Sequence, residues 1–277
     1  YCRSRWVTQY FSHPISPQGQ YLDGFDTLRG IAAAYIALAH FWWFTHPVFH
    51  STQIALPPLG YGSKAVAMFV VLSGFLIYRS VLPIDGIHRL RQYIRRRFFR
   101  IYPVYFLSIV LGVLFVQNVS TQPSIDQFSF FVSELFMFRV FDFPMFSNPV
   151  SWSLYVEITF YAFLPLFVFF FGKERIVWPS VIVLIALIIG DQGPIREFYL
   201  WKYFFFGLLA SELTMRYAHL LRGGVSVAIL IVGLVGFLLD IQGPAYDWAA
   251  TIGLVDHNPA ELTLGLGISF GLVCLAL

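Results

Sequence analysis

Apolar runs of roughly membrane-crossing length recur along the chain and are separated by short polar segments. A transmembrane helix needs roughly 20 mostly apolar residues. The pattern therefore predicts eight helical spans, near residues 31–49, 64–82, 101–117, 151–171, 177–190, 198–215, 225–241 and 259–277. No internal repeat or low-complexity linker divides the chain, so we expect an all-α, polytopic transmembrane helix bundle in one domain.

The composition agrees with lipid as the surrounding solvent. Hydrophobic residues make up 58% of the 277 residues and charged residues only 12%, and the mean hydropathy is +0.70. This is more apolar surface than one soluble core buries. We therefore expect an integral, multi-pass protein of the cell membrane, with lipid and not nucleic acid among its partners.

The two ends of the chain predict a cytoplasmic leader and a missing C-terminal part. Residues 1–21 hold no continuous apolar stretch, so they do not resemble a signal peptide. The sequence ends at Leu277 within an apolar run, which indicates that the C-terminal part of the protein is missing. Cys2 and Cys274 lie at opposite ends, so neither a disulfide framework nor a cysteine metal site is expected.

The distribution of basic residues favours an N-terminus in the cytoplasm. In that orientation most of the 18 lysines and arginines face inward, as the positive-inside rule requires, and four face outward: Lys64, Arg139, Arg196 and Lys202. Residues 128–146 are apolar enough to span but contain Glu134, Arg139 and Asp142. Each buried charge would cost about 2.5–3.5 kcal/mol, so we interpret this stretch as an interfacial or re-entrant segment on the outer face.

His40 lies near the middle of the first predicted span, roughly 14 Å from its start. Arg29 precedes it by eleven residues, a spacing that returns to nearly the same helical face. Arg29 could hold an anionic group near the cytoplasm while His40 addresses a reacting atom about 16 Å deeper. Asp23 and Asp26 could cap this helix or orient Arg29. A core histidine bonded to a neighbouring helix and a snorkelling arginine remain open alternatives.

Glu157 lies about two turns inside the fourth predicted span. Ser153 and Tyr161 lie one turn to either side of it, so the three residues form one polar stripe on a helix. Glu157 could orient and polarise His40, as a carboxylate does for a catalytic imidazole. Alternatively, it could only tie two helices together.

Six arginines gather on the inner side between the second and third predicted spans: Arg89, Arg91, Arg95, Arg96, Arg97 and Arg100. Positive-inside bias and anionic-lipid contact account for the first two. Arg97 and Arg100, spaced i, i+3, would point the same way on a helix, and paired guanidinium groups bind phosphate oxygens bidentately.

Without a Walker loop, a GxGxxG turn or an HExxH sequence, ATP hydrolysis and dinucleotide binding gain no support. Ser73 lacks the glycine of a nucleophile elbow and is expected to permit close helix packing.

Together these segments resemble the membrane acyltransferase-3 family, which O-acylates extracytoplasmic carbohydrates. Four motifs carry the resemblance in the family's order: LDGFDTLRGIAA at 22–33, FVVLSGFLI at 69–77, the RxxR-containing loop RFFRIYP at 97–103 and WSLYVEITFY at 152–161. The resemblance implies a bundle of about ten spans, with the essential histidine at His40. It also implies acyl-CoA as donor, bound at Arg29, Arg97 and Arg100. The motif residues taken as supporting are Asp26, Tyr102, Trp152, Ser153 and Tyr161.

We therefore expect an O-acyltransferase domain over residues 22–277, with His40 and Glu157 as its catalytic residues. It would move an acyl group, by family habit acetyl, from cytoplasmic acyl-CoA to a hydroxyl of an extracytoplasmic carbohydrate or glycolipid. His40 would act as general base or briefly carry the acyl group itself. Acyl-CoA would be a co-substrate, and no permanently bound cofactor or metal is expected. The alternatives are a transporter that uses His40, Glu157 and Arg29 as a relay, and a scaffolding protein.

Overall fold

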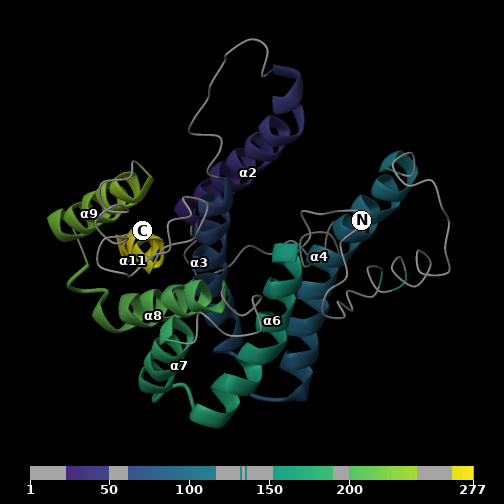
Figure 1. Cartoon of the computed structure of the whole chain (residues 1–277). Helices are drawn as coiled ribbons and strands as arrows, with labels where there is room; N and C mark the ends of the chain where they lie inside the picture. Colours follow the sequence, from purple (N-terminus) through teal and green to yellow (C-terminus); the bar gives the residue numbers. More distant parts are fainter. Residues whose placement is uncertain are drawn as a thin grey trace, which may run out of the picture. The chain divides into compact units, whose positions relative to one another are not determined.

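A computed structural model describes residues 23–49, 62–116, 132, 135, 152–189, 200–221, 223–241 and 264–276. These ranges contain eight α-helices and no strand (Figure 1), so the all-α prediction is confirmed for them. The helices are α2 (Asp23–Phe49), α3 (Gly62–Val81), α4 (Ile87–Val116), α6 (Trp152–Phe171), α7 (Val177–Ile189), α8 (Trp201–Tyr217), α9 (Gly224–Ile241) and α11 (Leu264–Ala276).

The helices fall on the eight apolar runs, but two of them begin earlier than predicted. α2 starts at Asp23 rather than near residue 31. α4 is a helix of 30 residues that starts at Ile87. The arginine-rich segment, which the resemblance describes as a loop, is therefore helical, as the i, i+3 spacing of Arg97 and Arg100 supposed. Arginine, leucine and glutamine favour helices, and no proline interrupts α4 before Pro103.

The number of membrane spans stays a prediction. Within the described ranges, one helical segment, Ser153–Phe171, is long and apolar enough to cross a membrane. Four other apolar helical segments are shorter: Thr27–Phe41, Ala65–Val81, Val177–Ile188 and Gly224–Gly236. The predicted leader 1–21 and, apart from positions 132 and 135, the predicted interfacial segment 128–146 lie outside the described residues.

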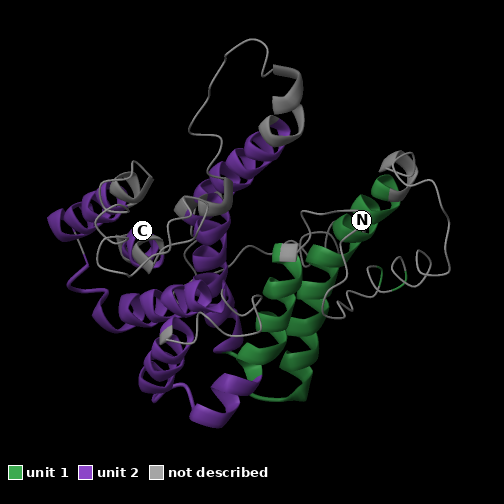
Figure 2. Ribbon diagram, in the orientation of Figure 1, with its two compact units in different colours: residues 1–12, 83–165 green, residues 13–82, 166–277 purple. Residues whose placement is uncertain are grey.

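The chain divides into two compact units (Figure 2). Unit 1 comprises residues 1–12 and 83–165, and unit 2 comprises residues 13–82 and 166–277. Among the described helices, unit 1 thus holds α4 and α6 as far as Pro165, whereas unit 2 holds α2, α3, α7, α8, α9 and α11.

Two glycines let the backbones of α3 and α8 touch in unit 2. A Cβ atom at Gly74 would lie 2.8 Å from Cα of Phe204, and one at Gly207 would lie 2.7 Å from the backbone nitrogen of Phe75. Any larger residue at either position would force the helices apart, which is the usual reason for small residues at tight helix crossings. Ser73, expected to permit close packing, is buried beside this crossing.

α2 packs on α3 through a narrow strip of buried side chains. Phe25, Ala32 and Ala39 are buried and recur every seven residues, a spacing that keeps one helix face toward its neighbour. At the start of this strip, the rings of Phe25 and Phe75 stack with centroids 4.4 Å apart. Further along, the strip consists of small alanines, and the flank of α2 that carries Arg29 and His40 is half-buried.

Candidate functional site

Arg29 and His40 lie on the uninterrupted helix α2 in unit 2, and both are half-buried. The guanidinium carbon of Arg29 lies 5.2 Å from the centroid of the Phe69 ring on α3. His40 Nδ1 lies 2.8 Å from the carbonyl oxygen of Ile36. Because a carbonyl can only accept, Nδ1 must donate in this bond, so in the neutral ring Nε2 carries the basic lone pair.

Arg97 lies between two tyrosine rings in unit 1. Its guanidinium carbon is 5.6 Å from the ring centroid of Tyr93 and 5.2 Å from that of Tyr161. The Tyr93 hydroxyl donates to the backbone oxygen of Tyr161 at 3.1 Å, which ties α4 to α6. Burial is the main cause that raises the pKa of Tyr93 to about 12, although Arg97 opposes it. The hydroxyl therefore stays protonated at neutral pH and remains a donor.

Glu157 joins the same cluster through Tyr161. The Tyr161 hydroxyl donates to Glu157 Oε1, one turn earlier on α6, and the glutamate is only 7% exposed. Ser153 lies one further turn back and is half-buried. The predicted polar stripe of α6 is thus present, and it meets Arg97 of α4. We call Tyr93, Arg97, Glu157 and Tyr161 the unit 1 cluster.

Tyr93 was missed by the sequence analysis. It precedes Arg97 by one helical turn, and the helical spacing that was applied to Arg97 and Arg100 could have been extended to it. Arg100, one turn beyond Arg97, is exposed. Tyr102, two residues after Arg100, donates to the backbone oxygen of Leu135 at 3.1 Å. This bond links α4 to residue 135.

Two predicted groupings remain untested. His40 and Arg29 belong to unit 2, whereas Glu157, Arg97 and Arg100 belong to unit 1, so both the pairing of Glu157 with His40 and a donor site of three arginines stay predictions. The side chains of Asp26 and Trp152 lie outside the described part of the chain. No group of three or more metal-ligating side chains occurs among the residues that the structure describes.

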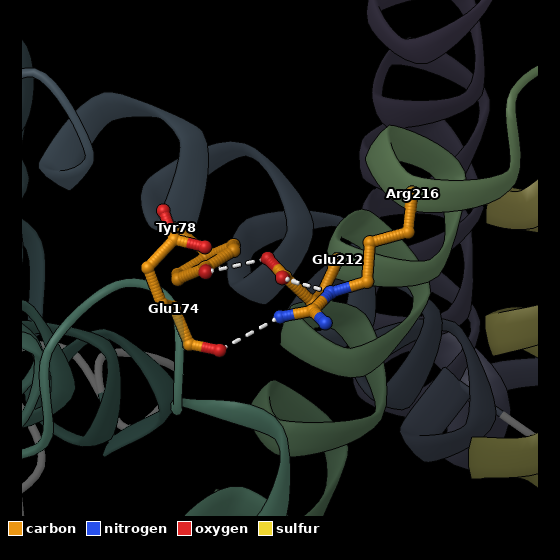
Figure 3. A network of polar contacts seen from close by, with 4 residues as sticks. All are labelled: Tyr78, Glu174, Glu212 and Arg216. Carbon is orange, nitrogen blue, oxygen red and sulfur yellow. Dashed lines mark hydrogen bonds and ion pairs between the residues drawn. The ribbon is translucent and has the colours of Figure 1, made fainter.

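A second polar cluster, which the sequence did not predict, lies in unit 2 (Figure 3). Glu212 of α8 is only 5% exposed, and both of its carboxylate oxygens have partners. Tyr78 donates to Oε2 at 2.6 Å, and Arg216 Nε donates to Oε1 at 2.6 Å. Arg216 Nη2 also donates to the backbone oxygen of Glu174 at 3.0 Å. The cluster neutralises a buried charge and joins α3, α8 and the segment after α6.

Comparisons with known proteins give one family and one relative. A family model described as an acyltransferase domain matches residues 22–277. The protein named "Putative acetyltransferase ORF330" of Acidianus two-tailed virus is 24% identical over 245 residues, which cover 83% of this chain and 70% of the viral protein. No solved structure matches the chain significantly.

Proposed function

Because the chain belongs to the acyltransferase-3 family, as its four motifs predicted, we propose that it is a membrane O-acyltransferase. It moves an acyl group from cytoplasmic acyl-CoA to a hydroxyl of an extracytoplasmic carbohydrate or glycoconjugate. Acyl transfer itself follows from the family match and from the relative that carries an acetyltransferase name. That name also favours acetyl as the group transferred. The donor and the acceptor are part of the proposal.

The bond from His40 to Ile36 is the single observation that carries the chemical step. It fixes the proton on Nδ1 and leaves Nε2 basic. In the proposed step Nε2 takes the proton of the acceptor hydroxyl, the oxygen attacks the thioester carbonyl, and the C–S bond breaks. His40 then returns the proton to the CoA thiolate. The same nitrogen could instead attack the thioester and carry the acyl group for one step.

The arginines of the two motifs are proposed to bind the phosphates of CoA. Arg97 is suited to this because the rings of Tyr93 and Tyr161 contact its guanidinium group and planar guanidinium forks bind phosphate oxygens bidentately. Arg100 and Arg29 are its proposed partners, and Glu157 is the carboxylate proposed to orient His40. Tyr161 contacts both Glu157 and Arg97, so a substitution at Glu157 would also affect binding of the donor.

Apolar side chains on the exposed helix surfaces support a membrane location. Phe169, Phe170 and Trp178 are 80%, 75% and 74% exposed. Exposing several large apolar side chains so close together would be unfavourable in water. They lie on or just after Ser153–Phe171, the apolar segment of membrane-crossing length. Lipid contact explains both features.

The experiment measures release of free CoA from acetyl-CoA by the purified protein in detergent or proteoliposomes, with and without candidate glycans. His40→Ala should abolish turnover without lowering the melting temperature. His219→Ala, at an exposed histidine of the same unit, should keep wild-type turnover. Equal loss in both variants would contradict the role of His40. A wild-type protein that neither cleaves nor binds any acyl-CoA would favour the transporter alternative.

A further inference from the structure

Arg79, near the end of α3, is a half-buried cation whose described partners carry no negative charge. Its Nε donates to Ser211 Oγ at 3.0 Å, and its guanidinium carbon lies 4.4 Å from the Phe75 ring centroid. Removing a charge from water is costly unless an opposite charge compensates it. Among the described residues no carboxylate provides that compensation.

The nearby carboxylate of Glu212 is already committed. Tyr78 and Arg216 occupy its two oxygens at 2.6 Å each, as Figure 3 shows. Arg216 on α8 is therefore paired with a carboxylate. Arg79 contacts the adjacent Ser211 instead and has no carboxylate among its described partners. This difference separates a structural arginine from one that is suited to a ligand.

Arg79 and Arg29 both belong to the α2–α3 pair. Phe25, one turn before Arg29, stacks on Phe75, one turn before Arg79. Because Arg29 contacts Phe69, the two helices run antiparallel, and the two arginines lie on opposite sides of this stack. Arg29 in turn contacts only the Phe69 ring among its described partners. Phe69 and Phe75 are six residues apart on α3, about 9 Å along the helix axis. Unit 2 thus presents two ring-supported guanidinium groups along one helix pair, and neither has a described carboxylate.

We propose that Arg79 binds a phosphate group of the acyl-CoA donor and forms, with Arg29, an anion site in unit 2. This inference rests on the proposed function. A guanidinium has five N–H donors. Ser211 accepts from Nε, which leaves the N–H groups of the two terminal nitrogens for phosphate oxygens. CoA carries a diphosphate and a separate ribose phosphate, so it can engage two arginines that are several ångströms apart.

The test is calorimetric titration of the purified full chain in detergent with CoA. Arg79→Gln should weaken CoA binding about tenfold or more, since a lost charge-assisted hydrogen bond is worth about 1.5–3 kcal/mol and 1.4 kcal/mol is tenfold. The matched control is Arg216→Gln, which should change the affinity less than about twofold while it lowers the melting temperature. S-acetylpantetheine, which lacks these phosphates, should bind wild type and Arg79→Gln equally.

The outcomes separate this inference from the proposed function. Wild-type CoA affinity in Arg79→Gln, together with weak binding in Arg29→Gln, would overturn the role of Arg79 and leave the acyltransferase proposal standing. A wild-type protein that binds no CoA would overturn both. Where Arg79→Gln does not fold, Arg79→Lys keeps the charge but loses the fork. We expect about threefold to tenfold weaker CoA binding in Arg79→Lys, and unchanged affinity would overturn the inference.

Discussion

Tyr93 acts in the unit 1 cluster through its ring and through its hydroxyl, and two substitutions distinguish these. Tyr93→Phe keeps the ring beside Arg97 but removes the hydroxyl, which bonds to the backbone of Tyr161 and also interacts with Arg97. A neutral hydrogen bond is worth about 0.5–1.5 kcal/mol. Tyr93→Ala also removes the cation–π contact, worth about 0.5–2 kcal/mol. The two losses together are about 1–3.5 kcal/mol, all of it in contacts that hold Arg97 in place.

If Arg97 binds the donor, these energies should appear in the KM for acetyl-CoA. At 1.4 kcal/mol per tenfold change, we expect KM to rise about twofold to tenfold in Tyr93→Phe and about fivefold to several hundredfold in Tyr93→Ala. The kcat should stay within about twofold, because the contacts act on ground-state and transition-state binding alike. Steady-state kinetics at saturating acceptor measures both constants.

The control is Tyr217→Ala, at an exposed tyrosine of α8, which should leave both constants unchanged. A fall in kcat with unchanged KM in Tyr93→Ala would refute the reasoning, because it would place the cluster at the chemical step rather than at the donor. An effect of Tyr93→Phe as large as that of Tyr93→Ala would show that the ring contributes nothing to holding Arg97.

Two further predictions concern the stability of unit 2. Tyr78→Phe removes a donor from the buried carboxylate of Glu212 and should lower the free energy of unfolding by about 1.5–3 kcal/mol; a melting temperature in detergent equal to that of wild type would contradict this. Gly207→Ala places a methyl group against the backbone oxygen of Val71 and should destabilise the protein by about 1–3 kcal/mol. Gly30→Ala, where a Cβ meets nothing within 4 Å, should melt like wild type or slightly higher.

The helices could be located from the sequence because apolar runs of sufficient length mark them directly. The first turns of α2 and the arginine-rich half of α4 were missed because these segments are helical without being apolar. Their helicity depends on backbone propensity and on continuation into an apolar run, and neither produces a hydrophobic signal.

The candidate site was predictable only where its residues share one helix. Glu157 and Tyr161 are four residues apart, so their contact could be expected from helical geometry alone. Arg97 and Tyr161 lie on different helices, and Tyr78 and Glu212 are separated by 134 residues. A single sequence does not say which helices are neighbours, so these contacts could be found only in three dimensions.

The glycine crossing of α3 and α8 determines how far the charged side chains must reach. Tyr78 and Arg79 lie about one turn beyond Gly74 on α3, and Ser211 lies one turn beyond Gly207 on α8. The short side chain of Ser211 accepts from Arg79 at 3.0 Å, about one turn from the place where the two backbones touch. Spreading the helices by the width of one methyl group would lengthen this contact without altering any charge. If Arg79 binds a donor phosphate as proposed, substitutions at Gly74 and Gly207 should therefore weaken CoA binding as well as stability, and a screen for CoA affinity would identify them as readily as a screen for stability.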